Sequence, residues 1–515
     1  MIDKQTAQHD RSSLVSLCLL WSGVLCAGLL LYGWTVQQGI SWQDSGMFQW
    51  RVLAGDYIGN LGLVLAHPLY IAIGRLFLFV PFGSELTLLN FCSGVGMAIA
   101  LANVSVLGFL ITGRRWIGLM TAGLLAVMHT PWSLSTIAEV YTWNAAFFTA
   151  ELILFITCIR KPCLLKLFGL FLCNGLNFGV HNMALLSLPV YGTWVLIFVF
   201  RRRLSPVSIV VAGAAFVSGS APLVWLVVQD FLQTGSLQLS LESLLVGRYA
   251  ANVLNVSSTH PLVAVNAALS SLNFLHFGLP LGGVGLIVMT KSIGKPLAWS
   301  LLTLLCIHGL FFGSLSLPDQ FTFIVPTLVL FSLGMAVGMD VVARKSAGWK
   351  RAVVVLCLLS IVCMPLLYAS VPPTLKKLDI NVSRSRVLPF RDEIRYWIVP
   401  WKHTEDSAEQ FARAALLQAA PDGLIVCDST SYYPLILMKE RISGVEGVSI
   451  EGYSIMARRY GSEPDALVVL LRERPVFIVS PVLNFITGEY RQDFDFSREP
   501  DRILYRLSVA GHGAS

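Results

Sequence analysis

The sequence contains few charged residues. Only 13% of its 515 residues are charged, against roughly 25% in soluble domains, and 55% are hydrophobic. This composition excludes an ordinary cytosolic protein. The charges are also unevenly placed, because residues 1–370 carry 19 basic and 11 acidic residues, whereas residues 371–515 carry 18 and 19. We therefore expect a polytopic helical membrane domain over residues 1–371 and a water-soluble domain over residues 372–515, long enough to bury a core.

Nucleic-acid binding and cysteine-based sites also lack support. The net positive charge lies entirely in the membrane part, so the soluble part offers no basic surface for a nucleic acid. Nine of the ten cysteines lie in or beside apolar runs, and Cys427 is the only one after residue 371, which excludes a disulfide within that domain. No C-x-x-C pair has the spacing of a metal site. The sequence thus indicates neither a divalent metal nor another cofactor.

Eleven apolar runs of near 20 residues predict membrane-spanning helices. They cover residues 14–36, 86–111, 116–130, 142–159, 163–180, 183–200, 207–229, 273–290, 297–316, 321–343 and 352–371. A twelfth stretch, Leu61–Val80, contains His67, Pro68 and Arg75, which suits a juxtamembrane or re-entrant helix better than a span in contact with lipid.

The basic residues predict the orientation of the chain. With eleven spans, sixteen of the 19 basic residues of the membrane part fall on one side, as the positive-inside rule requires of the cytoplasmic face. We therefore expect a cytoplasmic N-terminus and a C-terminal domain on the outer face, which is periplasmic in a bacterial inner membrane, the location we favour, and lumenal in a eukaryote. Seven of the 11 acids of the membrane part and only three bases then lie on the outer face: Asp44, Asp56, Glu85, Glu139, Asp230, Glu242 and Asp319 with Arg51, Arg75 and Arg248. This asymmetry predicts that any chemistry takes place on the outer face.

Each motif of the outer loops has a simple structural explanation when taken alone. Asp44 precedes an amphipathic run and suits a helix N-cap. His67 before Pro68 suits the start of another helix. Glu139 and its aromatic neighbours suit the membrane interface, and His181 suits equally an interfacial histidine bonded to backbone and a sugar or phosphate ligand.

The order and spacing of these motifs resemble the GT-C superfamily of polytopic membrane glycosyltransferases. The resemblance is to the branch related to protein O-mannosyltransferases, long catalogued as a domain of unknown function. It covers roughly residues 14–200 and rests on four motifs: Asp44-Ser45-Gly46, His67-Pro68-Leu69-Tyr70 with Gly74-Arg75-Leu76-Phe77, Ala138-Glu139-Val140-Tyr141 with Asn144, and Gly175-Leu176 leading to His181. Met47 departs from the pattern, since that branch often has Glu directly after the triplet.

The resemblance implies transfer of a hexose or mannose from a polyprenyl-phosphate lipid to an acceptor hydroxyl of a protein or glycan. It implies that the first outer loop, residues 37–85, carries the catalytic carboxylate. Asp44 is the expected general base, with Glu139 or Asp56 as helper. The residues expected to bind the substrate, including cations for the leaving phosphate, are His67, Arg75, Tyr141, His181 and Arg248, with Arg51 as a further cation.

A transporter or flippase of a lipid-linked sugar is the alternative function, because apolar helices are common to both classes. Transporters tend to show inverted repeats and charges at the bilayer midplane. This sequence shows no such repeat, and its acids gather at one interface. A non-catalytic scaffold explains neither those acids nor the Asp44 motif. Two carboxylates are expected to be structural: Glu151 in mid-span, and Asp340 with Arg344 one turn later.

Strand and helix patterns alternate in residues 372–515. After a basic, aromatic segment that ends at Trp401-Lys402, we expect helices at 408–419 and 432–441, further helical segments at 454–459 and 465–472, and strands at 423–427 and 476–480. This order favours a small parallel α/β sheet. Asp428 follows the first strand, where it suits either a ligand contact or a turn.

Overall fold

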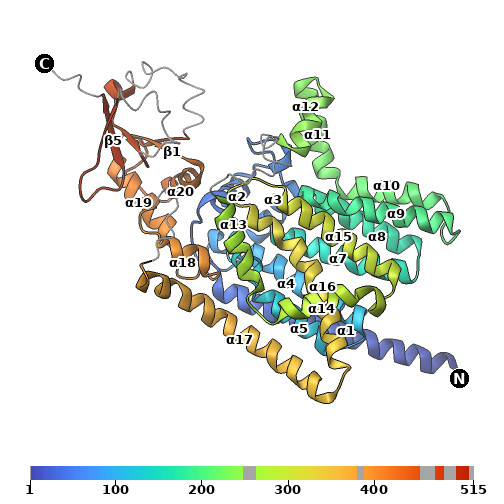
Figure 1. Cartoon of the computed structure of the whole chain (residues 1–515). Helices are drawn as coiled ribbons and strands as arrows, with labels where there is room; N and C mark the ends of the chain where they lie inside the picture. The colour runs from blue at the N-terminus through green and yellow to red at the C-terminus, as the bar shows by residue number, and fades with distance from the viewer. Residues whose placement is uncertain (1, 248–261, 380–387, 453–469, 481–493, 510–515) are drawn as a thin grey trace.

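The computed structural model describes residues 2–247, 262–379, 388–452, 470–480 and 494–509. Most of this chain is helical, and a small sheet domain lies beyond one end of the helical bundle, away from the N-terminus (Figure 1). The predicted fold class, a helical membrane part followed by a small domain with a sheet, is confirmed.

Seven helical segments of the described chain are long and apolar enough to cross a membrane. They are the apolar part of α1 (Ile2–Thr35), α4 (Glu85–Thr112), α7 (Tyr141–Arg160), the 3-10 helix η2 (Asn182–Ser187) continued by α9 (Leu188–Phe200), α15 (Lys295–Gly313), η5 (Gln320–Ile324) continued by α16 (Val325–Ala343), and α17 (Ala347–Lys377). The chain is therefore an integral membrane protein.

Two bent helix pairs raise the number of spans to nine if each pair crosses once. One pair is α10 (Val207–Gly219) with α11 (Ala221–Thr234), and the other is α13 (Leu262–Ser271) and η4 (Leu272–Phe274) with α14 (Gly278–Ser292). The bends are 73° and 85°. The remaining two predicted spans are shorter helices, α5 (Arg115–Ala126) and α8 (Leu164–Val180). The 12-residue α5 is about 18 Å long, less than the roughly 30 Å of an apolar bilayer core.

The two carboxylates predicted to be structural are both paired. Glu151 accepts hydrogen bonds of 2.8–3.1 Å from three side chains: Asn174, Asn177 and Tyr191. Asp340 forms ion pairs of 2.6 Å with Arg344 and 3.1 Å with Arg114. These contacts confirm that both acids are paired within the bundle.

The first loop is built from α2 (Gln43–Ala54), η1 (Leu63–Leu65) and α3 (Pro68–Phe77). The stretch Leu61–Val80 thus forms short helices and no single long one. The buried Arg51 joins α2 to the start of α3, since its guanidinium donates to the carbonyls of Asp56, Leu65 and Ala66 at 3.2, 2.8 and 2.7 Å. These bonds hold the parts of the first loop together.

The C-terminal domain contains one five-stranded sheet in the order β2-β1-β3-β5-β4. The strands are β1 (Leu424–Cys427), β2 (Ser449–Gly452), β3 (Val476–Ile478), β4 (Phe494–Ser497) and β5 (Tyr505–Val509). β2, β1 and β3 are parallel as predicted, but β5 and β4 add two antiparallel strands that the sequence pattern did not indicate. The sheet is therefore mixed.

The predicted helices and strands of this domain are otherwise found. α18 (Glu393–Ile398) precedes α19 (Ser407–Ala419) and α20 (Ser429–Lys439), and the latter two match predicted helices. The predicted helical segments at 454–459 and 465–472 lie wholly or mostly outside the described residues. Asp428 caps α20 by accepting hydrogen bonds from the backbone and hydroxyl of Ser431 at 3.0 and 2.7 Å, which confirms its role in a turn.

A hydrophobic cluster joins this domain to the first loop. Trp42 is 1% exposed, its ring lies 5.2 Å from that of Phe411, and its Nε1–H donates to Ser407 at 2.9 Å. Ile40 and Leu86 belong to the same cluster. The core of the C-terminal domain therefore extends into the first loop, which places residues 388–407 against the bundle.

We expect Trp42→Ala to lower the stability of this attachment by about 3–5 kcal/mol, because the change removes a large buried ring. Thermal unfolding and limited proteolysis of the C-terminal domain measure the effect. Trp34→Ala is the matched control, since Trp34 is 82% exposed. Equal unfolding and cleavage of the two variants would contradict a role for Trp42 in docking.

Candidate active site

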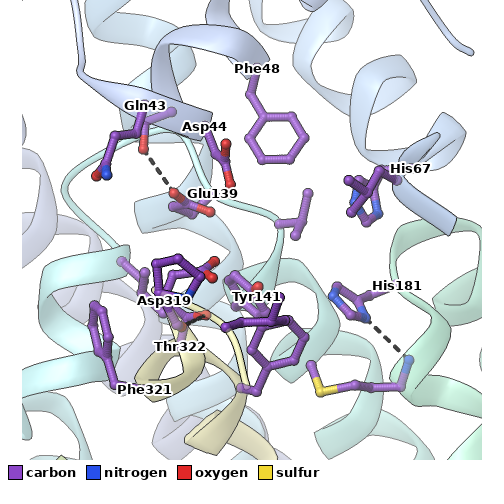
Figure 2. Close-up of a pocket in the computed structure, with 18 of the residues that line it drawn as sticks. Gln43, Asp44, Phe48, His67, Glu139, Tyr141, His181, Asp319, Phe321 and Thr322 are labelled. Atoms are coloured by element: carbon purple, nitrogen blue, oxygen red, sulfur yellow. Dashed lines mark hydrogen bonds between the residues drawn. The ribbon is translucent and has the colours of Figure 1, made fainter. Parts of the chain in front are cut away.

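A cavity of about 450 Å³ lies between the first loop, the helical bundle and the C-terminal domain. Figure 2 shows Asp44, Glu139 and Asp319 on one side of it, and His67 and His181 on the other. Tyr141 also lines it. Five of the predicted site residues therefore line the same cavity. Asp319, which was not predicted to be a site residue, lines it as well.

Asp44 lies in the first turn of α2, and its side chain is accessible from the cavity. Within the described residues Trp42 is the N-cap and no side chain caps this helix, so the capping explanation for Asp44 is wrong. The preceding Gln43 has a φ of 56°, a strained conformation for a residue other than glycine. No described residue donates a hydrogen bond to the Asp44 carboxylate, so the carboxylate is free to accept a proton.

Burial, followed by the negative charge of Asp319, raises the pKa of Asp44 to about 7. Burial and then the charge of Asp44 raise the pKa of Glu139 well above its usual range, and burial raises the pKa of Asp319. Burial and the repulsion between neighbouring carboxylates therefore raise the pKa values of all three carboxyl groups.

The side chain of Ser45 connects the Asp-Ser-Gly triplet to the Glu139 motif. The Ser45 hydroxyl donates a 2.8 Å hydrogen bond to Glu139 Oε1 (dashed in Figure 2). The backbone N–H of Glu139 donates to Ser93 Oγ at 2.7 Å. These two bonds hold Glu139 in the wall of the cavity. Gly46 has a different role, because a Cβ there would lie 2.4 Å from the carbonyl oxygen of Ser41.

The two histidines offer different hydrogen-bonding groups to the cavity, because one ring accepts and the other donates. His67 Nδ1 lies 2.7 Å from the carbonyl oxygen of Val180, which only accepts, so Nδ1 carries the proton. His181 Nδ1 accepts from the N–H of Met183 at 3.1 Å, so it carries none. Burial lowers the pKa of His67 well below its usual range and that of His181 to about 4, so both rings are neutral at pH 7. Nε2 of His67 is therefore an acceptor, and Nε2–H of His181 is a donor.

His67 confirms only one of the two structural expectations for it. It is the residue before α3, as its position next to Pro68 predicted, but its side chain makes no capping hydrogen bond within the described structure. Its φ is 48°, the second strained conformation at the cavity. The rings of His67 and His181 lie 5.3 Å apart, and Tyr141 lies 5.2 Å from His181.

The predicted cations and the second helper carboxylate lie elsewhere. Arg75 donates to the carbonyl of Val52 at 3.2 Å, and Arg51 is occupied by the carbonyls named above, so neither lines this cavity. Arg248 lies outside the described residues. Asp56 lines a smaller, second cavity beside Arg51. Of the two predicted helpers, only Glu139 lies in the same cavity as Asp44.

Lys402 is the only Lys or Arg that lines the cavity among the described residues. Its side chain is 3% exposed, and Nζ donates to the carbonyls of Tyr396 and Val399, which leaves one N–H for a ligand. Burial lowers the pKa of Lys402 to about 7, opposed by Glu405. The sequence identified this lysine only as the end of a basic, aromatic segment.

In the part of the chain that the structure describes, no group of three or more His, Cys, Asp or Glu side chains is arranged to hold a metal ion. The cavity instead brings together three carboxyl groups, two neutral histidines and one amine. These groups belong to Asp44, Glu139, Asp319, His67, His181 and Lys402. Such groups can take a proton from a hydroxyl and bind a departing anion.

Comparison with solved structures identifies the fold. ArnT from Cupriavidus metallidurans bound to undecaprenyl phosphate is 12% identical, with a TM-score of 0.53 over 96% of this chain and 99% of that one. ArnT in the apo state is 11% identical, with a TM-score of 0.55 over 96% and 98%. The chain has the GT-C fold. An oligosaccharyltransferase from Archaeoglobus fulgidus is less similar, at 12% identity and a TM-score of 0.46 over 96% and 75%. The sequence matches no protein-family model and no curated protein.

Proposed function

We propose that the protein is a glycosyltransferase that moves a sugar from a polyprenyl-phosphate lipid to an acceptor hydroxyl. The observation that carries this proposal is the meeting of an unbonded carboxylate, Asp44, and a buried amine, Lys402, in one cavity. The GT-C fold supports a lipid-phosphate donor, since an ArnT of the same fold was solved with undecaprenyl phosphate.

Asp44 is the general base of the proposed reaction. The acceptor O–H gives its proton to the Asp44 carboxylate while the acceptor oxygen forms a bond to C1 of the sugar. The C1–O bond to phosphate breaks, its electron pair stays on the phosphate oxygen, and the polyprenyl phosphate leaves. Lys402 stabilises the charge of this leaving group through its remaining N–H.

The lining of the cavity supplies separate places for the sugar and the lipid. His181 donates and His67 accepts hydrogen bonds, as sugar hydroxyls require. Apolar side chains line the cavity beside these histidines and suit the first prenyl units: Val64, Leu185, Leu186, Leu245 and Val246. Burial and the charge of Asp44 raise the pKa of Glu139, which favours its neutral form and so reduces repulsion of the phosphate.

The sequence supplies the arguments for the proposed sugar and orientation. The resemblance to the O-mannosyltransferase branch favours a hexose such as mannose. The positive-inside distribution favours a cytoplasmic N-terminus and a C-terminal domain on the outer face, which is the periplasm if the protein lies in a bacterial inner membrane. Incubation of the purified protein in nanodiscs with polyprenyl-phosphate mannose and polyprenyl-phosphate glucose tests the function. Release of polyprenyl phosphate supports it, whereas movement of the lipid across liposomes without release would favour a flippase.

We expect a bell-shaped dependence of kcat/KM on pH, with its maximum near pH 7. Activity rises as Asp44, whose pKa is about 7, loses its proton, and falls as Lys402, whose pKa is also about 7, loses its own. A bound phosphate favours the charged amine, so the alkaline limb of kcat lies at higher pH. Lys402→Arg keeps its charge at all these values and removes the alkaline limb. An unchanged alkaline limb in this variant would contradict the role of Lys402.

A further inference from the structure

A second cavity, of about 180 Å³, lies where α2 and the first loop meet α20 of the C-terminal domain. Three partly exposed aromatic side chains line it: Trp50, Tyr432 and Tyr433. The ring centroids of Trp50 and Tyr433 are 5.8 Å apart, and those of Tyr432 and Tyr433 are 5.2 Å apart. The transfer chemistry described above uses none of these rings.

Polar groups complete the lining of this second cavity. Asp56 is 30% exposed, and its Oδ1 accepts hydrogen bonds from the backbone N–H groups of Ile58 and Gly59 at 3.1 and 2.8 Å. Its Oδ2 lies 3.7 Å from Arg51 Nε, which keeps the carboxylate in one position. The Asn60 side chain is exposed and has no hydrogen bond to another described residue. A fixed carboxylate and a free amide therefore border the aromatic rings.

This combination suits a sugar ring. A pyranose presents C–H bonds on its faces, which pack on aromatic rings, and hydroxyl groups around its edge, which bond to carboxylate and amide oxygens. The cavity of about 180 Å³ holds the volume of about six water molecules, which is enough for one ring but not for several residues of an extended peptide.

The second cavity adjoins the candidate active site. Met47 and Leu65 line both cavities and form their common wall. Tyr433 packs against α2 at Gly46, where an added Cβ would lie 3.4 Å from Tyr433 Cβ. Residues of α2 that directly follow Asp44 therefore lie between a ligand in the second cavity and the candidate active site.

We propose that this cavity binds a sugar ring of the acceptor, so that the acceptor is a carbohydrate and not an unmodified peptide. This inference rests on the proposed function, because it assigns the acceptor side of the same reaction.

Saturation-transfer NMR of the full chain in nanodiscs tests the proposal, with the methyl glycosides of glucose, galactose, mannose and N-acetylglucosamine as probes. We expect binding of at least one glycoside, weakened about tenfold by Tyr432→Ala and by Asn60→Ala, as the loss of one good contact gives. Tyr432→Phe, which keeps the ring, should retain binding. Tyr57→Ala is the matched control, since Tyr57 belongs to the same loop, is 37% exposed and does not line the cavity.

Three results would overturn the carbohydrate site: no binding of any glycoside, binding that neither Tyr432→Ala nor Asn60→Ala weakens, or displacement of the glycosides by an unmodified Ser/Thr peptide. Failure of the proposed function would give a different experimental result. If Asp44→Asn left sugar transfer unchanged, the assignment of the base would fail, while glycoside binding sensitive to Tyr432→Ala would still support the second cavity as a sugar site.

Discussion

Asp44→Asn is expected to reduce sugar transfer by about 10²–10⁴-fold, the usual effect of losing a general base. The amide has nearly the same shape as the carboxylate but does not accept a proton. No described residue bonds to the Asp44 carboxylate, so the substitution breaks no hydrogen bond of the fold. Release of polyprenyl phosphate and glycosylation of the acceptor measure the loss.

The stability of this variant separates a catalytic role from a structural one. The pKa of Asp44 is raised in the folded state, so its charge opposes folding at every pH above its unfolded pKa of about 4. Asp44→Asn should therefore unfold at the same or a higher temperature than the wild type at pH 8. Glu85→Gln is the control, because Glu85 is 63% exposed and does not line the cavity. Full transfer activity in folded Asp44→Asn would remove Asp44 from the mechanism.

Lys402→Gln is expected to weaken binding of undecaprenyl phosphate by about 10–100-fold. A hydrogen bond between charged groups contributes about 1.5–3 kcal/mol, which corresponds to this range. Gln keeps a donor for the carbonyls of Tyr396 and Val399, so residues 396–402 should stay in place. Equilibrium binding of the lipid to nanodisc-embedded protein gives the affinity.

The matched control for this experiment is Lys377→Gln, an exposed lysine at the end of α17. Its affinity for undecaprenyl phosphate should equal that of the wild type. If Lys402→Gln and Lys377→Gln bound the lipid equally well, the phosphate would have to be held by other groups, such as His181 or backbone N–H groups.

Local patterns and a family resemblance predicted the part of the site that comes from residues 44–181. Asp44 and Glu139 lie in short motifs, and the Ser45 hydroxyl joins them directly. Asp319 and Lys402 follow hundreds of residues later, and nothing in their local sequence indicates the cavity they share. The tally of outer acids contained Asp319 but could not place it beside Asp44.

Arg75 shows why charge counting alone did not identify Lys402, the proposed phosphate ligand. An arginine in an outer loop has two competing partners, a ligand and the backbone carbonyls of its own loop. Arg75 and Arg51 both bond to carbonyls, which the sequence does not reveal. The eleven spans predicted from the sequence exceed the seven to nine candidate spans of the structure for a related reason. Hydropathy detects the length of an apolar run, but it detects neither the bends of 73° and 85° nor the early end of α5.

A structure of the Asp44→Asn protein in nanodiscs with polyprenyl-phosphate mannose would test the central claim most directly. The account predicts the donor phosphate within about 3 Å of Lys402 Nζ, the sugar C1 facing residue 44, and the prenyl chain along Leu185 and Leu245. A donor bound elsewhere, with the cavity between Asp44 and Lys402 empty, would contradict it.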